Sequence, residues 1–194
     1  AAELFRKLGN DAELADVASS RADVAELLED HDAYDTHLAE AAELYRKLGY
    51  DWQLVNILNN QGHRAGELGD HNTAATLHTE AVELSHKLDD GLGLRHSLVF
   101  LASAAMKLND FEAAAIHFKR LAGLYREGYG YEAGDLADTL VSQGIVAGNL
   151  GDFSMTESYL DEAAELYRKL GDDDGVARTQ DLLAELARQL EGQN

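Results

Sequence analysis

Histidine is the residue type in this sequence that most readily suggests a metal or acid-base site. The chain has eight histidines, at His31, His37, His63, His71, His78, His86, His96 and His117. Zinc hydrolases bring two histidines onto one helix face with a glutamate beside the first, and no HExxH or similar pair at ligand spacing occurs here. We therefore interpret these residues as scattered surface histidines and predict no metal site.

Two other segments resemble functional motifs. The spacing of Gly128, Gly130 and Gly134 is similar to that of a phosphate-binding loop, but no strand precedes it. The run DDDG at 172–175 resembles the beginning of a calcium loop, yet it lacks the alternating ligands and the final glutamate, so we interpret it as a helix cap. No serine or histidine stands in a nucleophile elbow, and the carboxylates mostly fall at solvated helix positions. We predict no catalytic residue, no cofactor and no enzymatic activity.

Composition narrows the class of partner. The 194 residues include 45% apolar residues, no cysteine, and a formal net charge of −20. This charge repels phosphate backbones and anionic lipids, which argues against nucleic acid or a membrane and favours a basic or neutral protein. The charge has a second interpretation, in which it only keeps the surface soluble or adapts it to salt. The lack of cysteine excludes disulfides and thiolate zinc sites and is consistent with the cytoplasm, and no apolar run approaches the roughly 20 residues of a membrane helix.

Two interleaved repeats run through the chain. The first comprises LFRKLGN from Leu4, LYRKLGY from Leu44, LSHKLDD from Leu84, LYREGYG from Leu124 and LYRKLGD from Leu166, with steps of 40, 40, 40 and 42 residues. The second begins at Leu28, Leu68, Leu108, Leu150 and Leu190, half a unit away. Since apolar residues between these marks recur at helical spacing, each unit is expected to contain two helices.

Turn residues place the ends of these helices. Gly69 and Gly151 follow the last helical leucine, where glycine accepts a left-handed conformation, and Asp70, Asp110 and Asp152 suit the N-cap of the next helix. The predicted helices span residues 1–8, 11–28, 31–48, 51–68, 71–88, 91–108, 111–127, 131–150, 153–170 and 175–190.

The small residues resemble the pattern of tetratricopeptide repeats. The glycines, the Gly-Asp turns and the paired alanines of that family correspond to Gly62, Gly69, Asp70, Ala74 and Ala81 in the second unit, to Ala102, Asn109, Asp110, Ala114 and Phe118 in the third, and to Gly144, Gly151, Asp152 and Ala163 in the fourth. The 40-residue period resembles kinesin light chains, polarity adaptors and bacterial regulators with an upstream ATPase module. HEAT repeats share this period, but the turns and the alanines favour the tetratricopeptide assignment.

The resemblance implies an all-α fold, a right-handed α-solenoid of antiparallel helix hairpins. We expect one domain over residues 1–194, with a partial unit at 1–10, units at about 11–50, 51–90, 91–130 and 131–172, and a terminal helix at 173–194. Because the chain begins within a unit, we interpret it as a piece of a longer protein, and we expect Leu4, Phe5 and Leu8 to permit end-to-end self-association. The loop at 127–134 has two interpretations: it acts as a hinge or an aromatic contact patch with Tyr125, Tyr129 and Tyr131, or these tyrosines pack beneath the loop, which is the commoner case.

The first helix of each hairpin lines the concave face in tetratricopeptide arrays. Carrying this register over gives a predicted peptide-binding face of Asn56, Asn59, His63, His96, Val99, Ser103, Met106, Asp138, Val141, Ile145 and Asn149. Asparagine amides can both donate to and accept from a peptide backbone, and the apolar members would anchor the ligand. The valines have a second interpretation, as packing between neighbouring helices.

These observations predict a cytoplasmic protein–protein interaction scaffold. It would hold a peptide or protein segment with basic and apolar side chains in its concave groove. The alternative is a C-terminal sensor or oligomerisation arm of a larger bacterial signal-transduction ATPase or transcriptional regulator.

Overall fold

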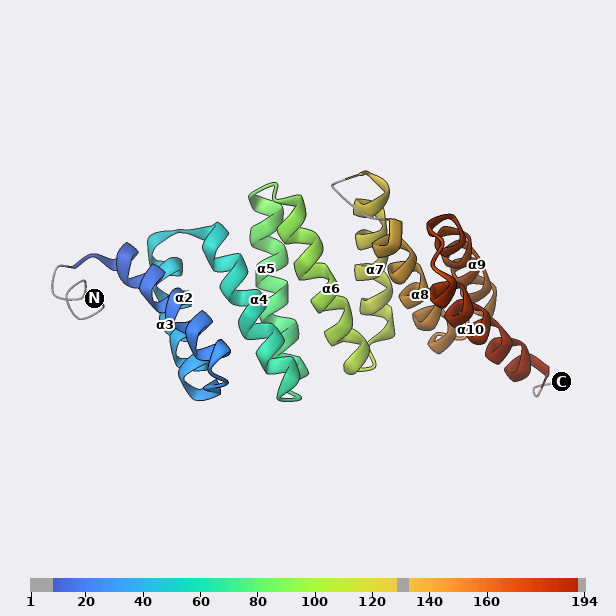
Figure 1. Cartoon of the computed structure of the whole chain (residues 1–194), viewed down its shortest axis with the longest axis horizontal. Helices are drawn as coiled ribbons and strands as arrows, with labels where there is room; N and C mark the ends of the chain where they lie inside the picture. Colours follow the sequence, from blue (N-terminus) through green and yellow to red (C-terminus); the bar gives the residue numbers. More distant parts are fainter. Residues whose placement is uncertain (1–8, 129–132, 192–194) are drawn as a thin grey trace. The chain divides into compact units, whose positions relative to one another are not determined.

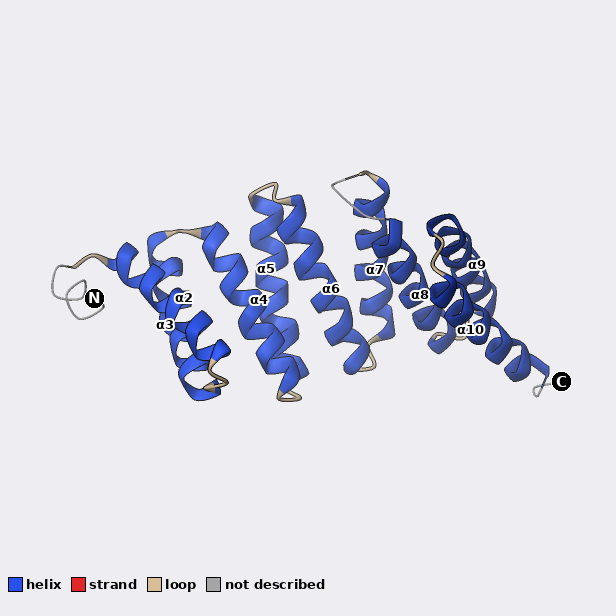
Figure 2. Cartoon of the chain, in the orientation of Figure 1, coloured by secondary structure: helices blue, strands red, loops and turns tan. Residues whose placement is uncertain are grey.

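The computed structural model of the chain describes residues 9–128 and 133–191, and within them the regular structure is entirely helical (Figures 1 and 2). The helices are α2 (Asp11–Leu27), α3 (His31–Leu48), α4 (Asp51–Glu67), α5 (His71–Lys87), α6 (Gly91–Lys107), α7 (Phe111–Arg126), α8 (Ala133–Asn149), α9 (Phe153–Leu170) and α10 (Asp173–Glu191). Most predicted ends lie within one residue of those observed, whereas α8 and α10 each begin two residues from the predicted start. The helix expected at 1–8 lies outside the described residues.

Aspartate side chains begin the second helix of successive hairpins. Asp30, Asp70, Asp110 and Asp152 each accept a hydrogen bond from the backbone N–H three residues ahead. Such a cap satisfies an otherwise unpaired donor and stabilises a helix by about 1 kcal/mol. Asp172 accepts from the Gly175 N–H at 2.9 Å, which confirms the interpretation of the DDDG run as a helix cap.

The turns require a left-handed residue after the helix. Gly69 and Gly151 take φ of 81° and 78°, as predicted. Glu29 and Asn109 take φ of 56° and 58° at the equivalent turns, and Asp89 takes 53° in the other turn of the repeat, where Gly49 takes 70°. These side chains are less suited to that region than glycine. The repeat therefore retains its turn geometry even where the sequence lacks glycine.

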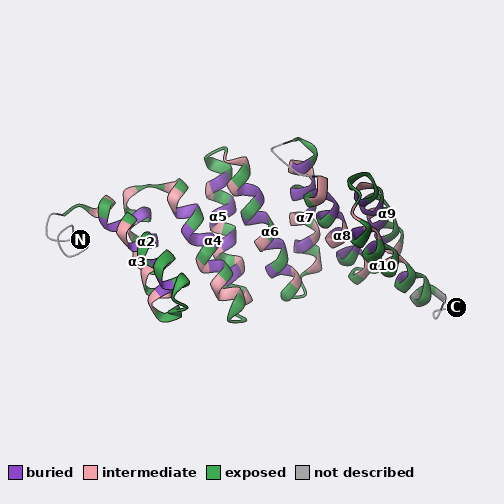
Figure 3. Cartoon of the chain, in the orientation of Figure 1, coloured by how far each residue is buried: buried purple, intermediate pink, exposed green. Residues whose placement is uncertain are grey.

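Neighbouring helices pack as hairpins through small side chains. Helices α4 and α5 lie side by side, as do α8 and α9 (Figure 1). Gly62 shows why a small residue is needed, since a Cβ atom built there would lie 2.6 Å from the ring of His78 on α5. Along each helix, buried residues alternate with exposed ones (Figure 3). The predicted all-α fold of antiparallel helix hairpins is confirmed.

The chain divides into two compact units, residues 1–100 and 101–194, and the division falls within α6. The core of the first unit includes Leu38 and Leu58, which are 1% and 0% exposed. Leu140 and Leu160, at 0% and 1%, lie in the core of the second. The single domain over 1–194 remains a prediction.

Candidate functional site

Most of the predicted peptide-binding residues are exposed or half-buried. The exposed ones are Asn56, His63, His96, Val99, Ser103, Asp138, Ile145 and Asn149, and the half-buried ones are Met106 and Val141. Val99 belongs to the first unit, and Met106, Val141 and Ile145 belong to the second. The predicted face as a whole therefore remains a prediction.

Asn59 is an exception, because its side chain is buried. The residue is 2% exposed, its Nδ2 donates to Ser97 Oγ at 3.0 Å, and its Oδ1 lies 3.1 Å from His78 Nδ1. The oxygen accepts the Nδ1 proton of neutral His78, so both ends of the amide are engaged. The interpretation of Asn59 as an amide available to a ligand is wrong, and its role is to link α4 to α5 and α6.

Replacing Asn59 with alanine is expected to lower the free energy of unfolding by about 1–3 kcal/mol, because the buried Ser97 and His78 would lose their partner. Asn56→Ala is the matched control, since Asn56 is exposed on the same helix and should change stability by less than about 0.5 kcal/mol. Urea denaturation of both variants measures the difference. Equal stability of the two would contradict the structural role of Asn59.

Three histidines surround Phe100 in the first unit. The ring of His78 stacks on that of Phe100 at 5.1 Å and 12°, and the rings of His63 and His96 lie 5.4 and 5.0 Å from it. His78 is 2% exposed, so its interpretation as a surface histidine is wrong. The repeat register carried a signal, because His78 occupies the position that Leu38, Phe118 and Leu160 take in the other hairpins, all of them buried.

Burial determines the protonation of this cluster. Loss of solvation is the main cause that lowers the pKa of His78 to about 4, and the charges of His63 and His96 act in the same direction. Burial also lowers the pKa of His96, with a further contribution from His63. At neutral pH His78 and His96 are therefore uncharged.

Asp138 is exposed but already engaged within its own unit. Its Oδ1 accepts a hydrogen bond from the Tyr167 hydroxyl at 2.5 Å and lies 3.4 Å from Arg178 Nη2. Burial, followed by the hydrogen bond to Asp138, raises the pKa of Tyr167. In the first unit the Tyr45 hydroxyl donates to Asp16 at 2.9 Å in the same way, and burial raises its pKa to about 12. The tyrosine–aspartate pair is thus a repeated link within a hairpin.

A hollow of about 230 Å³ lies between the first helices α8 and α10 of the second unit. Ile145 and Asn149 of the predicted face line it, together with Leu182, Glu185 and Leu186 of α10. Gly144 and Gly148 also line it, where α8 approaches Leu160 and Thr156 of α9 so closely that a Cβ atom at Gly144 would lie 3.0 Å from Leu160. This site combines an apolar interior with an amide and a carboxylate.

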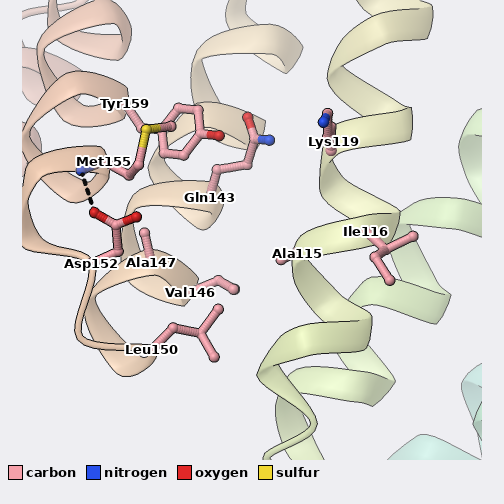
Figure 4. A pocket seen from close by; sticks show the side chains of 10 residues that line it. All are labelled: Ala115, Ile116, Lys119, Gln143, Val146, Ala147, Leu150, Asp152, Met155 and Tyr159. Carbon is pink, nitrogen blue, oxygen red and sulfur yellow. Dashed lines mark hydrogen bonds between the residues drawn. The ribbon is translucent and has the colours of Figure 1, made fainter.

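A second hollow, between α7, α8 and α9, did not appear in the sequence prediction (Figure 4). Its residues come from three helices, so no single helix face marked it. A comparison of the repeats could still have indicated it, because Val146 occupies the position that Arg64 has in the repeat at 51–90.

Metal binding, the predicted aromatic patch and the predicted self-association can be compared with the described residues. Among residues 9–128 and 133–191, no three histidine, aspartate or glutamate residues are grouped so as to hold a metal. Tyr125 is 7% exposed, which places it in the core, while Tyr129 and Tyr131 lie outside the described residues. Leu4, Phe5 and Leu8, predicted to self-associate, also lie outside them. No helix in the described part of the chain is long and apolar enough to cross a membrane.

Sequence comparison identifies no relative, since no protein-family model matches the chain and no curated protein does. Solved structures do match. BtubC (BKLC) from P. vanneervenii has a TM-score of 0.73 and 18% identity over 88% of this chain and 78% of its own. The apo form of RapI has a TM-score of 0.78 and 13% identity over 96% and 70%. Aspartyl phosphate phosphatase F from Bacillus subtilis has a TM-score of 0.71 and 13% identity over 93% and 50%.

The chain spans half of the length of the phosphatase and 78% of that of BtubC. Likeness at such low identity establishes the fold and not the activity. Together with the helix hairpins described above, it shows that this chain has a tetratricopeptide-like helical-repeat fold.

Proposed function

We propose that the chain is a protein-interaction scaffold that binds a peptide or protein segment along its first helices. The observation that carries this proposal is the hollow between α8 and α10, which is lined by Ile145 and Asn149 of the predicted face. An apolar side chain of the ligand would fill the hollow against Ile145, Leu182 and Leu186. Desolvated apolar anchors of this kind supply most of the binding energy in protein interfaces.

Charge and fold support the same proposal. The net charge of −20 favours a segment with basic side chains, because electrostatic attraction would speed its association. Added salt screens this attraction, so binding is expected to weaken as salt increases. One solved structure of similar fold is described as a Rap protein complexed with competence and sporulation factor, at a TM-score of 0.53 and 16% identity. The scaffold would act in the cytoplasm and would bind its partner without chemical conversion.

Replacing Ile145 with glutamate is expected to weaken binding of such a ligand by at least about tenfold, because a charge would enter the hollow. Ile145 is 37% exposed, so the change should leave folding intact. Peptides selected from a random display library on the wild-type chain provide the probe, and fluorescence anisotropy measures their affinity.

Ile116→Glu is the matched control, because Ile116 is 66% exposed on a second helix, α7, and does not line the hollow between α8 and α10. The proposal requires at least one class of selected peptides that carries basic and apolar residues, depends on Ile145 and ignores Ile116→Glu. We call the hollow that Ile145, Leu182 and Leu186 line the first-helix site. If every selected peptide bound Ile145→Glu as tightly as the wild type, this site would be refuted.

A further inference from the structure

The second hollow differs from the first in position and in chemistry. It has a volume of about 240 Å³, with α8 as its floor and α7 and α9 as its walls (Figure 4). Ala115 and Val146 face each other across it, and Leu150 lies below them (Figure 4). Lys119, Gln143 and Tyr159 form its other end. Asp152 also lines the hollow near Leu150, where its carboxylate accepts the Met155 N–H at 3.1 Å as the cap of α9. Apart from this capping carboxylate, that end is apolar, whereas the other end is polar.

The corresponding place in the first unit is occupied. Two repeat steps of 40 residues relate Ala115 to Asp35, and steps of 40 and 42 relate Val146 to Arg64. Arg64 Nε lies 3.4 Å from Asp35 Oδ1, and the arginine side chain is only 17% exposed. An ion pair therefore spans α3 and α4 where the second unit has two short apolar side chains and open space.

Gln143 provides an independent indication of a ligand. The residue is 5% exposed, and among the described residues its buried Oε1 has no hydrogen-bond partner. Its amide stands between Tyr159 and the helix that carries Lys119 (Figure 4). Buried acceptors in folded proteins nearly always have a donor, so this oxygen favours a ligand that brings an N–H or O–H group.

Lys119 adds a charge preference. Lys47 and Lys87 each contact an aspartate at 2.6 Å, whereas within the described part of the chain no carboxylate lies within ion-pair distance of Lys119. In a protein with 36 acidic and 16 basic residues, a lysine beside an apolar hollow favours a ligand with a carboxylate. This preference is opposite to that expected at the first-helix site.

The size of the hollow favours a side chain over a small molecule. Small-molecule sites usually have volumes of about 300–1,000 Å³ and enclose most of the ligand. The present hollow is smaller than this range and opens between α7 and α9, where Ile116 and Met155 remain 66% and 38% exposed. Such dimensions suit one anchor residue of a larger partner.

We propose that this hollow is a docking site for a protein segment that inserts one large apolar side chain between α7 and α9. The segment donates a main-chain N–H to Gln143 Oε1 and places a neighbouring aspartate or glutamate beside Lys119. This site is separate from the first-helix site and takes a partner of the opposite charge.

The double variant Ala115→Asp, Val146→Arg tests the proposal, because it transfers the Asp35–Arg64 pair of the first unit into the hollow. Peptides from the random display library are selected on the wild-type chain and counter-selected on this variant. We expect the recovered peptides to carry a large apolar residue next to an acidic one and to bind the double variant at least about tenfold more weakly. Circular dichroism establishes that the variant keeps its helical content and melting temperature.

Lys119→Glu is a second variant that does not depend on the packing of the hollow, since Lys119 is exposed. It should weaken the same peptides, whereas Ile145→Glu should leave their affinity unchanged. The proposal is overturned if the selection yields no peptide sensitive to the double variant, or if the sensitive peptides are basic. It is also overturned if only small aryl carboxylates, tested in parallel, show this sensitivity. Failure of the first-helix site affects none of these outcomes.

Discussion

Acidification from pH 7 to pH 4 is expected to lower the free energy of unfolding of the α4–α6 region by about 3 kcal/mol through His78 alone. The pKa of His78 falls from the ordinary 6.5 to about 4 in the folded protein, mainly because of burial. Between these two values the unfolded chain binds a proton that the folded protein does not. Stability is therefore complete above pH 6.5, declines as the pH falls toward 4, and shows no further change from this residue below 4.

Urea denaturation at pH values from 7 to 4 measures this effect. The carboxylates also titrate in that range, so wild type is compared with His78→Gln, which should lose about 3 kcal/mol less over the interval. His31→Gln, at an exposed histidine, is the matched control and should follow the wild type. Parallel curves for wild type and His78→Gln would contradict the assignment. An NMR titration of the His78 imidazole gives its pKa independently, even if the glutamine variant folds poorly.

Replacing Leu58 with alanine is expected to destabilise the first unit by about 2–5 kcal/mol. Leu58 is 0% exposed and lies in the core with Leu38, Val55 and Ala81. Shortening its isobutyl side chain to a methyl group reduces the buried apolar area and leaves a cavity. Close packing of the neighbouring helices prevents them from filling this cavity completely. Thermal and urea denaturation both measure the loss.

Leu27→Ala is the control for this substitution. Leu27 is also a helical leucine of the first unit, but it lies at the end of α2 and is 84% exposed, so its replacement should change stability by less than about 0.5 kcal/mol. A similar loss in both variants would mean that Leu58 does not lie in a close-packed core.

Local signals explain why the helices were predictable. Within the described residues, most helices begin at a side-chain cap, with α4 as an exception, and α2 to α9 end at a left-handed turn. These signals depend on residues within one turn of each other, as at Asp70 and Gly69. Their recurrence every 40 residues or so allowed the ends of nine described helices to be placed within two residues. The tetratricopeptide-like fold followed from the same residues.

The chemistry of individual side chains was less predictable because it depends on residues far away in the sequence. Asn59 lies on the expected first helix, yet it points at Ser97 and His78, which are 38 and 19 residues away. Whether an asparagine contacts a ligand or a neighbouring helix depends on a rotation of a fraction of a helical turn. The hollow between α7 and α9 was missed for a related reason, since it results from short side chains on three separate helices.

The contrast between Asp35–Arg64 and Ala115–Val146 bears on how such arrays diversify. Both pairs stand at equivalent positions of the repeat. Substitutions at these two positions distinguish a helix interface closed by an ion pair from one with an open hollow. A duplicated hairpin could consequently gain or lose an attachment point without any change in its curvature, its caps or its core. The binding sites of such a protein can therefore change independently at each interface between neighbouring helices.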